Sequence, residues 1–476
     1  MIKWLRDPEL LGLLIIAGLA AFYLTQLPIG ELSRYDEFKT LDRSNGFLLF
    51  GDWTTVYASN VPNFQKPPLQ YWMGAILLST GMDEHLAMKL PSWVFSIVCL
   101  FATAALVRNI APRHPWAVPA ALILLASSTE FWPYAMSGML ETGSAAFVSL
   151  ALLFGYRGFE RPGAWWWAAI FIGLGALQKS PAALVVVIVF IAGAATACWM
   201  KGAPMPGLRS RHFAGAAFAA LLLVAAWPLL QLRLNGYEAL RVSIQREMLD
   251  RFVPGDETGQ RGLQEVWRIV VRDEPFLRLG GIAGLFFLPG LLKEPRIWGF
   301  TAVAVGYVLA VLLAGGAIYP RYTLNFVPLF SAILAIWIFR SAWSMRRKWF
   351  VTAVGSVLML GPISPAKPPV ENAGSPPEVL AAVGAQLRPD EMLLVCAWES
   401  RLKVSPGTVS YYASNGRPFE YLLDNSDLEG LHEELAGKPL RGLCSRAEFA
   451  LLQSVFPQAE PLQPVGDGFV HFVVRP

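Results

Sequence analysis

The chain has 476 residues, of which 54% are hydrophobic and only 16% are charged. This composition excludes an ordinary soluble protein and indicates a polytopic membrane protein with a soluble portion. The net charge of +4 says little about partners, because basic residues in such chains sort by side of the membrane. The sequence shows no nucleic-acid signature, glycine-rich phosphate loop or Ser-His-Asp spacing. We therefore expect no nucleic-acid partner and no cofactor, and we expect a monomer in the lipid bilayer.

The first predicted membrane span covers about residues 10–28. This run is uncharged and long enough, at about 1.5 Å per residue, to cross roughly 30 Å of hydrocarbon. It lacks a convincing small-residue cleavage site, so we interpret it as a retained span and not as a signal peptide. Lys3 and Arg6 precede the span, which predicts a cytoplasmic N-terminus.

An outer loop of about residues 29–88 follows the first span. Within it Tyr35, Phe38 and Leu41 recur at helical spacing between charged residues, which predicts an amphipathic helix on the membrane surface. Residues 69–80 are apolar but too short to cross a bilayer, so we interpret them as an interfacial helix.

Ten further spans are predicted, and a second outer loop of about residues 233–275 separates the seventh from the eighth. With about eleven spans all the predicted inner turns carry Lys or Arg, as the positive-inside rule expects. One span contains Glu130, a costly residue at membrane depth. The ten spans cover about residues 89–107, 116–136, 143–156, 164–178, 182–200, 213–232, 276–292, 297–317, 323–339 and 349–363.

The fold class is therefore an all-α polytopic membrane domain, residues 1–363, with a small α/β domain at its C-terminus. Five prolines mark residues 364–377 as a linker. Residues 378–476 form the soluble domain, which this topology places on the outer face. Its predicted elements are helices at 378–387 and 427–435 and strands at 391–398 and 469–474.

The four cysteines divide between the two domains. Cys99 and Cys198 fall in predicted spans, where we expect them to be packing residues. Cys396 and Cys444 fall in the soluble domain and could pair in an oxidising compartment. Two buried thiols in neighbouring strands are the alternative that we favour.

Polar residues are concentrated in the first outer loop, between Glu31 and Trp72. One interpretation is a solvated loop, because charges just outside a span cost little. The other is a set of carboxylates and cations that act on a lipid-borne substrate. The loop contains Glu31-Leu-Ser-Arg34-Tyr35, then Gly51-Asp52-Trp53, Lys66-Pro67-Pro68 and Tyr71-Trp72.

This order and spacing resembles the first outer loop of polyprenyl-phosphate-dependent glycosyltransferases of the GT-C superfamily. The lipid A aminoarabinose transferases are the more similar family, and the protein O-mannosyltransferases are more distant. The resemblance implies an inverting transferase that moves a sugar from undecaprenyl phosphate to lipid A or another envelope glycolipid. It also implies a multi-pass protein of the bacterial inner membrane whose C-terminal domain is periplasmic.

The resemblance assigns the catalytic acid to Glu31, by its offset from Arg34-Tyr35. The family usually has Asp at this position, and Asp36 and Glu37 are rival carboxylates in the same loop. A carboxylate there would take a proton from, or orient, the acceptor hydroxyl. Glu141 matches a second outer acid of the family, although it could also be a solvated helix terminus.

The donor's leaving group would be a phosphate, which needs cations where its charge develops. Five cations at predicted outer positions match the family's motifs, although an outer lysine can also be a simple snorkelling anchor. They are Arg34, Lys66, Lys179, Arg251 and Arg321, and the neighbouring substrate-contact candidates are Tyr35, Tyr71 and Tyr322.

A metal site is not expected, because Gln65 and Met248 replace the Glu and His that pair in some aminoarabinose transferases. Three alternatives remain at this point. The chain could glycosylate protein with the same fold, it could transport lipid-linked substrates, or it could be a non-catalytic relative. A transporter would favour internal repeats and polar residues at the membrane midplane, and neither is visible here.

Overall fold

In the computed structural model the chain forms two compact units, which we call the helical unit and the mixed unit. The helical unit comprises Met1–Pro28, Phe64–Gln70 and Lys89–Pro365, and the mixed unit comprises Ile29–Asn63, Tyr71–Met88 and Ala366–Pro476. The structure describes residues 7–29, 32, 35–244, 264, 267–272, 274–313, 320–360, 376–396, 406–422, 435, 437–462 and 469–475.

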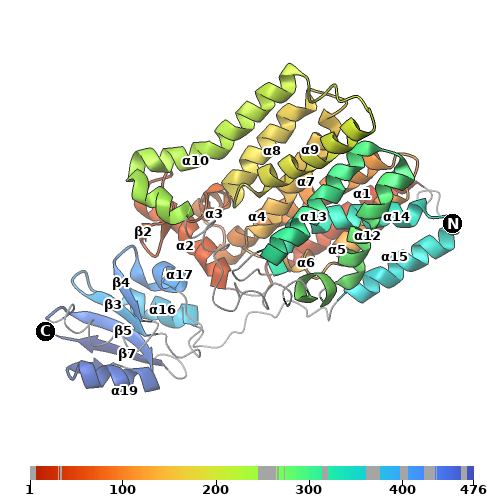
Figure 1. The fold of residues 1–476 in the computed structure, drawn as a ribbon. Coiled ribbons are helices and arrows are strands. Elements are labelled where there is room, and N and C mark those ends of the chain that lie inside the picture. Colours follow the sequence, from red (N-terminus) through yellow and green to blue (C-terminus); the bar gives the residue numbers. More distant parts are fainter. Residues whose placement is uncertain are drawn as a thin grey trace. The chain divides into compact units, whose positions relative to one another are not determined.

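The helical unit is a bundle in which apolar helices distant in sequence lie side by side, such as α5 with α14 and α9 with α13 (Figure 1). Among the described residues, five helices are long and apolar enough to cross a membrane: Pro8–Gln26, Glu84–Ile110, Ala182–Met200, Arg211–Glu238 and Pro295–Leu312. The helices are α1 (Pro8–Gln26), α4 (Glu84–Ile110), α5 (Ala117–Ala126), α6 (Trp132–Ala135), α7 (Glu141–Gly158), α8 (Ala164–Gln178), α9 (Ala182–Met200), α10 (Arg211–Ile244), α12 (Pro275–Leu292), α13 (Trp298–Leu313), α14 (Val327–Arg340) and α15 (Met345–Met359). A short π-helix, η3 (Trp267–Arg272), and two short 3-10 helices, η4 (Pro295–Ile297) and η5 (Pro320–Asn325), are also present.

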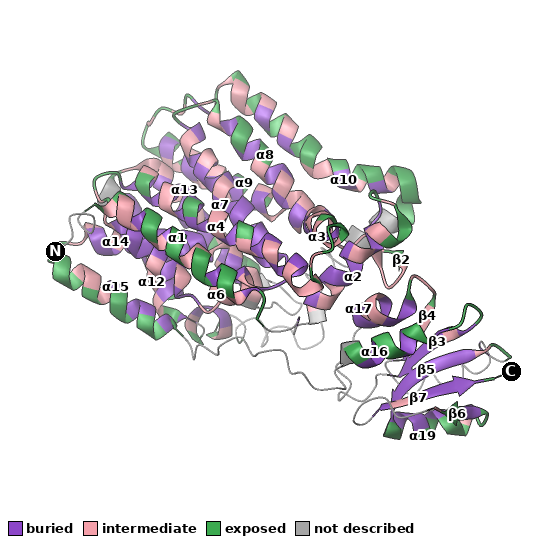
Figure 2. Ribbon diagram, turned by 180° about the vertical axis from the view of Figure 1, so that it is seen from behind, coloured by how far each residue is buried: buried purple, intermediate pink, exposed green. Residues whose placement is uncertain are grey.

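The bundle has an apolar interior and an apolar exterior. Helices α7 and α14 are buried along most of their length, whereas α10 is largely exposed (Figure 2). The exposed residues of α10 include Phe218, Leu221 and Leu222. A helix that is apolar on its exposed side fits a lipid environment, since water would disfavour such a surface.

Two predicted spans, 164–178 and 182–200, coincide with α8 and α9. The predicted span at 116–136 is instead broken, because α5 ends at Ala126 and α6 begins only at Trp132. In the break the hydroxyls of Ser128 and Thr129 donate hydrogen bonds to the Glu274 carboxylate. Such side-chain bonds compete with helical ones, so the apolar run does not continue as one helix.

Other helices differ from the predicted spans mainly in length. Helix α7 extends beyond 143–156 at both ends, and α10 continues past the predicted 213–232 to Ile244 with a kink at Gly236, whose φ is +80°. Glycine accepts this left-handed backbone without a Cβ penalty. Helix α15 begins close to Arg346, Arg347 and Lys348, and the total of eleven crossings stays a prediction.

The mixed unit joins the first outer loop to the C-terminal domain. The loop forms α2 (Tyr35–Phe50), a hairpin of β1 (Tyr57–Ala58) and β2 (Val61–Pro62), and α3 (Leu69–Ser79), most of which belongs to this unit. Helices α2 and α3 form where the sequence predicted an amphipathic helix and an interfacial helix, and their location at the membrane surface stays a prediction. At 11 residues α3 is too short to cross a bilayer.

In the described part of the C-terminal domain, a five-stranded sheet has the order β4-β3-β5-β7-β6. Strand β3 is parallel to β4 and β5, and β7 is antiparallel to β5 and β6. The predicted strand 469–474 coincides with β7, the predicted strand 391–398 contains β3, and the predicted helix 427–435 lies outside the described residues except for Leu435. The elements are α16 (Pro376–Ala385), β3 (Met392–Cys396), α17 (Pro406–Val409), η6 (Ser410–Ser414), β4 (Phe419–Leu422), β5 (Leu440–Ser445), α19 (Arg446–Val455), β6 (Ala459–Pro461) and β7 (Phe469–Val474).

Successive residues of β3 point to opposite faces of the sheet, and both faces are apolar. Leu393 and Val395 pack in a cluster with residues of α16, whereas Leu394 and Cys396 pack in a second cluster with residues of α19. A strand buried on both faces reads as a continuous apolar run, which is why the sequence revealed β3.

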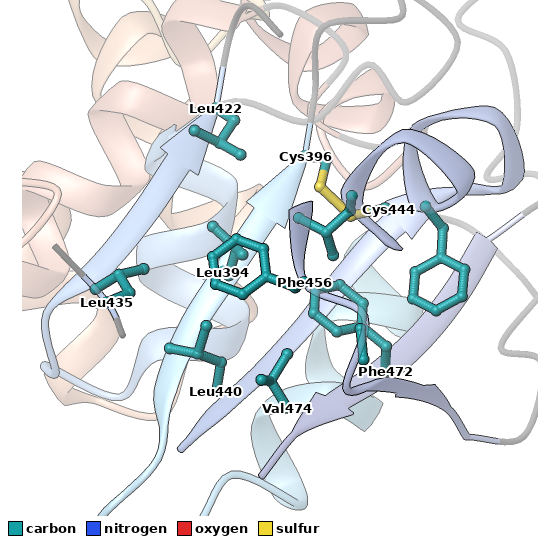
Figure 3. Packing of buried hydrophobic residues seen from close by; sticks show 12 residues of the cluster. Leu394, Cys396, Leu422, Leu435, Leu440, Cys444, Phe456, Phe472 and Val474 are labelled. Atoms are coloured by element: carbon teal, nitrogen blue, oxygen red, sulfur yellow. A yellow bond between two sulfur atoms is a disulfide. The ribbon is translucent and has the colours of Figure 1, made fainter. Parts of the chain in front are cut away.

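A disulfide joins Cys396 at the end of β3 to Cys444 in the neighbouring strand β5 (Figure 3). The expectation of two free buried thiols is therefore wrong for this pair. The sequence alone could not distinguish a disulfide from two thiols, because cysteines in neighbouring parallel strands can be in either form. A disulfide suits an oxidising compartment, as expected for a domain outside the cytoplasm.

The C-terminal domain packs against the first outer loop within the mixed unit. Gly407 in α17 lies so close to α2 that a Cβ there would sit 3.0 Å from the Phe38 carbonyl oxygen. The Asn60 amide of the hairpin donates to the Ser414 hydroxyl at 2.8 Å, and the Tyr412 hydroxyl donates to Glu84 at 3.2 Å. The loop is thus fixed by a domain more than 300 residues away in sequence.

Asp42 lies within this interface on α2 and is 6% exposed. Its Oδ2 accepts the backbone N–H of Ser59 at 2.8 Å. Burial raises the pKa of Asp42 to about 6, although hydrogen bonds from Ser410 and Ser59 and the charge of Arg43 act in the opposite direction. The native unit therefore favours protonation of Asp42 more than the unfolded chain does, although the carboxyl is still mostly ionised at neutral pH.

Replacing Asp42 by Asn should stabilise the mixed unit at neutral pH. An acid with a raised native pKa costs stability as pH rises from its unfolded pKa, near 4, through about 6, and the cost is complete above that. A shift of about two pKa units corresponds to roughly 3 kcal/mol. Unfolding midpoints of purified Asp42→Asn and wild-type protein, measured between pH 4.5 and 7.5, should diverge as pH rises.

Asp52 provides a control, because its native pKa is shifted in the opposite direction to that of Asp42. Slight desolvation is outweighed by hydrogen bonds from Thr54 and Thr55, which hold the pKa of Asp52 below its usual range. Asp52→Asn should therefore not stabilise the protein above pH 6. Parallel pH profiles for Asp42→Asn and wild type would contradict the burial of a costly charge at this interface.

Candidate functional site

Glu141 and Lys179 are brought together by two neighbouring antiparallel helices. Helix α7 begins at Glu141, a five-residue connection follows its end at Gly158, and α8 ends at Gln178. So short a connection reverses the chain direction, and the two helices pack along each other. The acid at the start of α7 and the lysine capping α8 both suit the helix dipoles.

The Glu141 carboxylate is shared by two cations. Its Oε1 lies 2.8 Å from Lys179 Nζ and 3.4 Å from Arg321 Nε, which comes from η5. The Tyr322 ring lies beside both cations, with its centroid 4.6 Å from Lys179 Nζ and 5.6 Å from Arg321 Cζ. Three segments distant in sequence therefore converge on one carboxylate oxygen.

This charge cluster is mostly shielded from solvent. The side chains of Glu141, Lys179 and Arg321 are 6%, 13% and 23% exposed. Glu141 is therefore not a solvated helix terminus, which was the alternative left open by the sequence. Two of the three side chains are cationic and one is anionic, so the cluster attracts anions, and partial burial strengthens that attraction.

Lys66 also belongs to the helical unit, in the turn before α3, where it is partly buried. In the mixed unit Asp36 lies 3.6 Å from Lys39 on the same face of α2. Tyr71 accepts a hydrogen bond of 2.8 Å from the buried Arg43 guanidinium. Glu31, Arg34, Arg251 and the side chain of Tyr35 lie outside the described residues, and their roles stay predictions.

A second charge cluster, which the sequence did not predict, lies in the helical unit. Arg278 on α12 is 1% exposed, and its Nη2 is 3.5 Å from Glu130 Oε1. Glu274, which precedes α12, accepts hydrogen bonds from Ser128 and Thr129. The cost of burying Glu130 is thus offset by a partner on α12. A single charged residue in an apolar run was the signal in the sequence that could have pointed to this cluster. Which residues pair depends on how the helices pack, and the sequence does not show that.

Groups of three or more potential metal-ligating His, Cys, Asp or Glu side chains do not occur in the portion of the chain described. Of the two positions considered for a metal pair in the sequence, Gln65 is among the described residues and Met248 is not.

Comparison with known proteins identifies the fold. A family model described as dolichyl-phosphate-mannose-protein mannosyltransferase matches residues 65–229. No curated protein matches the sequence. The solved structure of ArnT from Cupriavidus metallidurans bound to undecaprenyl phosphate has a TM-score of 0.68, with 14% identity and 97% of each chain covered. The structure of the apo form of that protein has a TM-score of 0.66, with the same identity and coverage. The chain has the GT-C fold.

A tethered complex of the oligosaccharyltransferase from Archaeoglobus fulgidus with an acceptor peptide is also similar, at a TM-score of 0.56 and 11% identity. That match covers 97% of this chain and 74% of the other. The GT-C resemblance and the helical fold class expected from the sequence are thereby confirmed. The chain is a multi-pass membrane protein of this fold, and the family-model match includes Lys66, Glu141 and Lys179.

Removing the shared charge should destabilise the GT-C bundle. Glu141→Gln keeps a side chain of similar size but leaves Lys179 and Arg321 facing each other without a carboxylate. A hydrogen bond to a charged group contributes roughly 1.5–3 kcal/mol, so the thermal unfolding midpoint should fall. Adding Lys179→Met should recover part of the loss, because it removes one of the two repelling cations.

The control is Glu238→Gln on α10. Glu238 pairs with Arg241 at 2.9 Å, but both side chains are more than half exposed. Surface pairs contribute little, so this variant should unfold like the wild type. Equal effects of Glu141→Gln and Glu238→Gln would show that the Glu141 cluster is not a buried charge network.

Proposed function

We propose that the chain is an inverting glycosyltransferase that moves a sugar from a polyprenyl phosphate, such as undecaprenyl phosphate, to an acceptor at the outer face of the membrane. The convergence of Lys179 and Arg321 on Glu141 carries the proposal, because distant cations are gathered where a phosphate could bind. Support also comes from the ArnT structure with undecaprenyl phosphate and from a family model named for a lipid-phosphate sugar donor.

The cations would act on the leaving group. When the bond between the sugar's anomeric carbon and the phosphate oxygen breaks, negative charge grows on the phosphate. Fixed cations that face this charge lower the barrier, since they need no reorganisation. Lys179 and Arg321 would supply this field, and Lys66, Arg34 and Arg251 would complete it. Arg321 can present a planar fork to phosphate oxygens, whereas lysine acts as a point charge.

A carboxylate in the first outer loop would act on the acceptor. Glu31 would accept the proton of the acceptor hydroxyl while the hydroxyl oxygen forms the new bond to the anomeric carbon. Attack opposite the departing phosphate inverts that carbon. Asp36 is the rival base, but its neighbour Lys39 lies 3.6 Å away and favours a paired, structural carboxylate. Glu141 would hold the cations and help to position the substrates.

The acceptor would be lipid A or another envelope glycolipid. A protein acceptor is the second candidate, because the matching family model is named for protein mannosyltransferases and the archaeal neighbour carries an acceptor peptide. We further propose a bacterial inner-membrane protein with a cytoplasmic N-terminus and a periplasmic C-terminal domain. Basic residues in the predicted inner turns and the disulfide support this orientation.

The proposed set of phosphate-binding cations, which we call the donor clamp, can be tested by binding undecaprenyl phosphate to the purified, folded protein. Lys66→Ala should weaken binding by roughly 10- to 100-fold, the loss expected for one charge-assisted contact. Lys66→Arg should recover only part of the affinity, because the guanidinium is larger and differently shaped. Lys201→Ala, at the exposed end of α9, should bind normally. Normal binding by Lys66→Ala would remove Lys66 from the clamp, and no binding by wild type would reject the donor class.

The base can be identified from turnover. Glu31→Gln keeps the shape of the side chain but removes its basicity, so transfer should fall by roughly 10²–10⁴ while donor binding is retained. Asp36→Asn is the matched comparison and should retain most activity. Products would be identified by mass spectrometry of envelope lipids and proteins incubated with the enzyme and donor. Loss of turnover in Asp36→Asn with normal turnover in Glu31→Gln would reverse the assignment.

A further inference from the structure

Two buried glutamines connect the backbone segments that carry three of the proposed site residues. Gln70 is 1% exposed and Gln178 is 0% exposed. The Gln178 amide donates a short hydrogen bond to Gln70 Oε1 and a second one, of 3.2 Å, to the Leu140 carbonyl. Gln70 Nε2 donates to the Met139 carbonyl at 3.0 Å. The two side chains therefore tie α3 and α8 to the backbone just before α7.

Each of these hydrogen-bonding residues is within four positions of a residue of the proposed site. Gln178 directly precedes Lys179, and the two carbonyls directly precede Glu141. Gln70 follows Lys66 by four residues, and the intervening Pro67 and Pro68 have fixed φ angles that limit the freedom of that segment.

From these contacts we infer that Gln70 and Gln178 are positioning residues. They set the backbone from which Lys66, Glu141 and Lys179 project, and they do not touch the substrate. This inference rests on the proposed function for its catalytic consequence, but the geometry it describes is independent of the reaction.

The bonding of the pair argues against a purely stabilising role. Gln178 Oε1 is buried without a hydrogen-bond partner. An unsatisfied buried oxygen lowers stability, and an apolar side chain of similar shape would avoid that cost. Fully buried amides with directional bonds fix one arrangement of the surrounding backbone, which apolar packing does not do. Ser92 adds to the restraint, since its hydroxyl donates to the Met139 carbonyl at 2.9 Å.

The decisive variant is the double substitution Gln70→Met/Gln178→Met in the full-length purified protein. Replacing both partners with apolar groups is nearly neutral for folding, whereas either single change leaves a buried amide without its partner. A structural role alone predicts that the double variant behaves like wild type in every assay. A positioning role predicts a normal unfolding midpoint together with a disturbed site.

Two measurements report on the site. Labelling of Lys179 by an amine-reactive reagent, followed by peptide mass spectrometry, should become several-fold faster when Glu141 no longer holds the amine. Affinity for undecaprenyl phosphate should fall roughly 10-fold, and transfer should fall up to about 10²-fold, the loss typical of a misplacement of 1 Å. The matched control is Gln231→Met, a 2% exposed glutamine on α10 that accepts a bond from Asn235.

Wild-type labelling and binding in the folded double variant would overturn the positioning role. If the double variant does not fold, Gln70→Asn serves instead, because its shorter amide cannot reach the Met139 carbonyl. Altered labelling and binding would then support the positioning role, and wild-type labelling and binding would overturn it. If wild-type protein does not bind undecaprenyl phosphate, the proposed function fails. Lys179 labelling then still decides the positioning inference, because it needs no substrate.

Discussion

The proposed site depends on one carboxylate, Glu141, that is shared by Lys179 and Arg321. Uncompensated cations in an apolar bundle would repel each other. The carboxylate offsets this repulsion and holds the two cations close together. It is held in turn by backbone geometry, since the N-terminus of α7 and the C-terminus of α8 lie at the same end of an antiparallel pair. Glu141 thus provides a counter-charge for the two cations when no other anion is bound.

Much of the membrane fold could be predicted from the sequence, because uninterrupted apolar runs and basic turns are local signals. Helices α8 and α9 coincide with their predicted spans for that reason. The prediction failed at residues 116–136, where Ser128 and Thr129 bond to Glu274, a partner supplied by a distant helix. The length of α10 beyond its span was also missed, because its polar continuation has no hydropathy signal.

The residues of the Glu141 cluster were named from the sequence but their arrangement was not, and their role as a functional site stays a prediction. Motif spacing pointed to Glu141, Lys179 and Arg321, yet nothing local shows that both cations meet on one carboxylate oxygen. Gln70 and Gln178 were missed because an uncharged polar residue near a span end is unremarkable until its partners are known. In the C-terminal domain, β3 and β7 were visible as apolar runs. That domain docks on the hairpin through the Asn60–Ser414 bond and on the start of α4 through the Tyr412–Glu84 bond, and these tertiary contacts have no sequence signature.

The shared carboxylate also constrains how a donor could bind. If a polyprenyl phosphate enters the cluster, its oxygens compete with Glu141 for Lys179 and Arg321, so part of each cation's attraction is already used. Binding is then weaker than to bare cations, and the same competition helps the product phosphate to leave. Such a balance works only if the carboxylate moves little, because a mobile Glu141 could approach or leave the cations unpredictably. In the proposed reaction, the backbone anchoring that Gln70 and Gln178 provide beside α7 would therefore serve the chemistry as well as the fold.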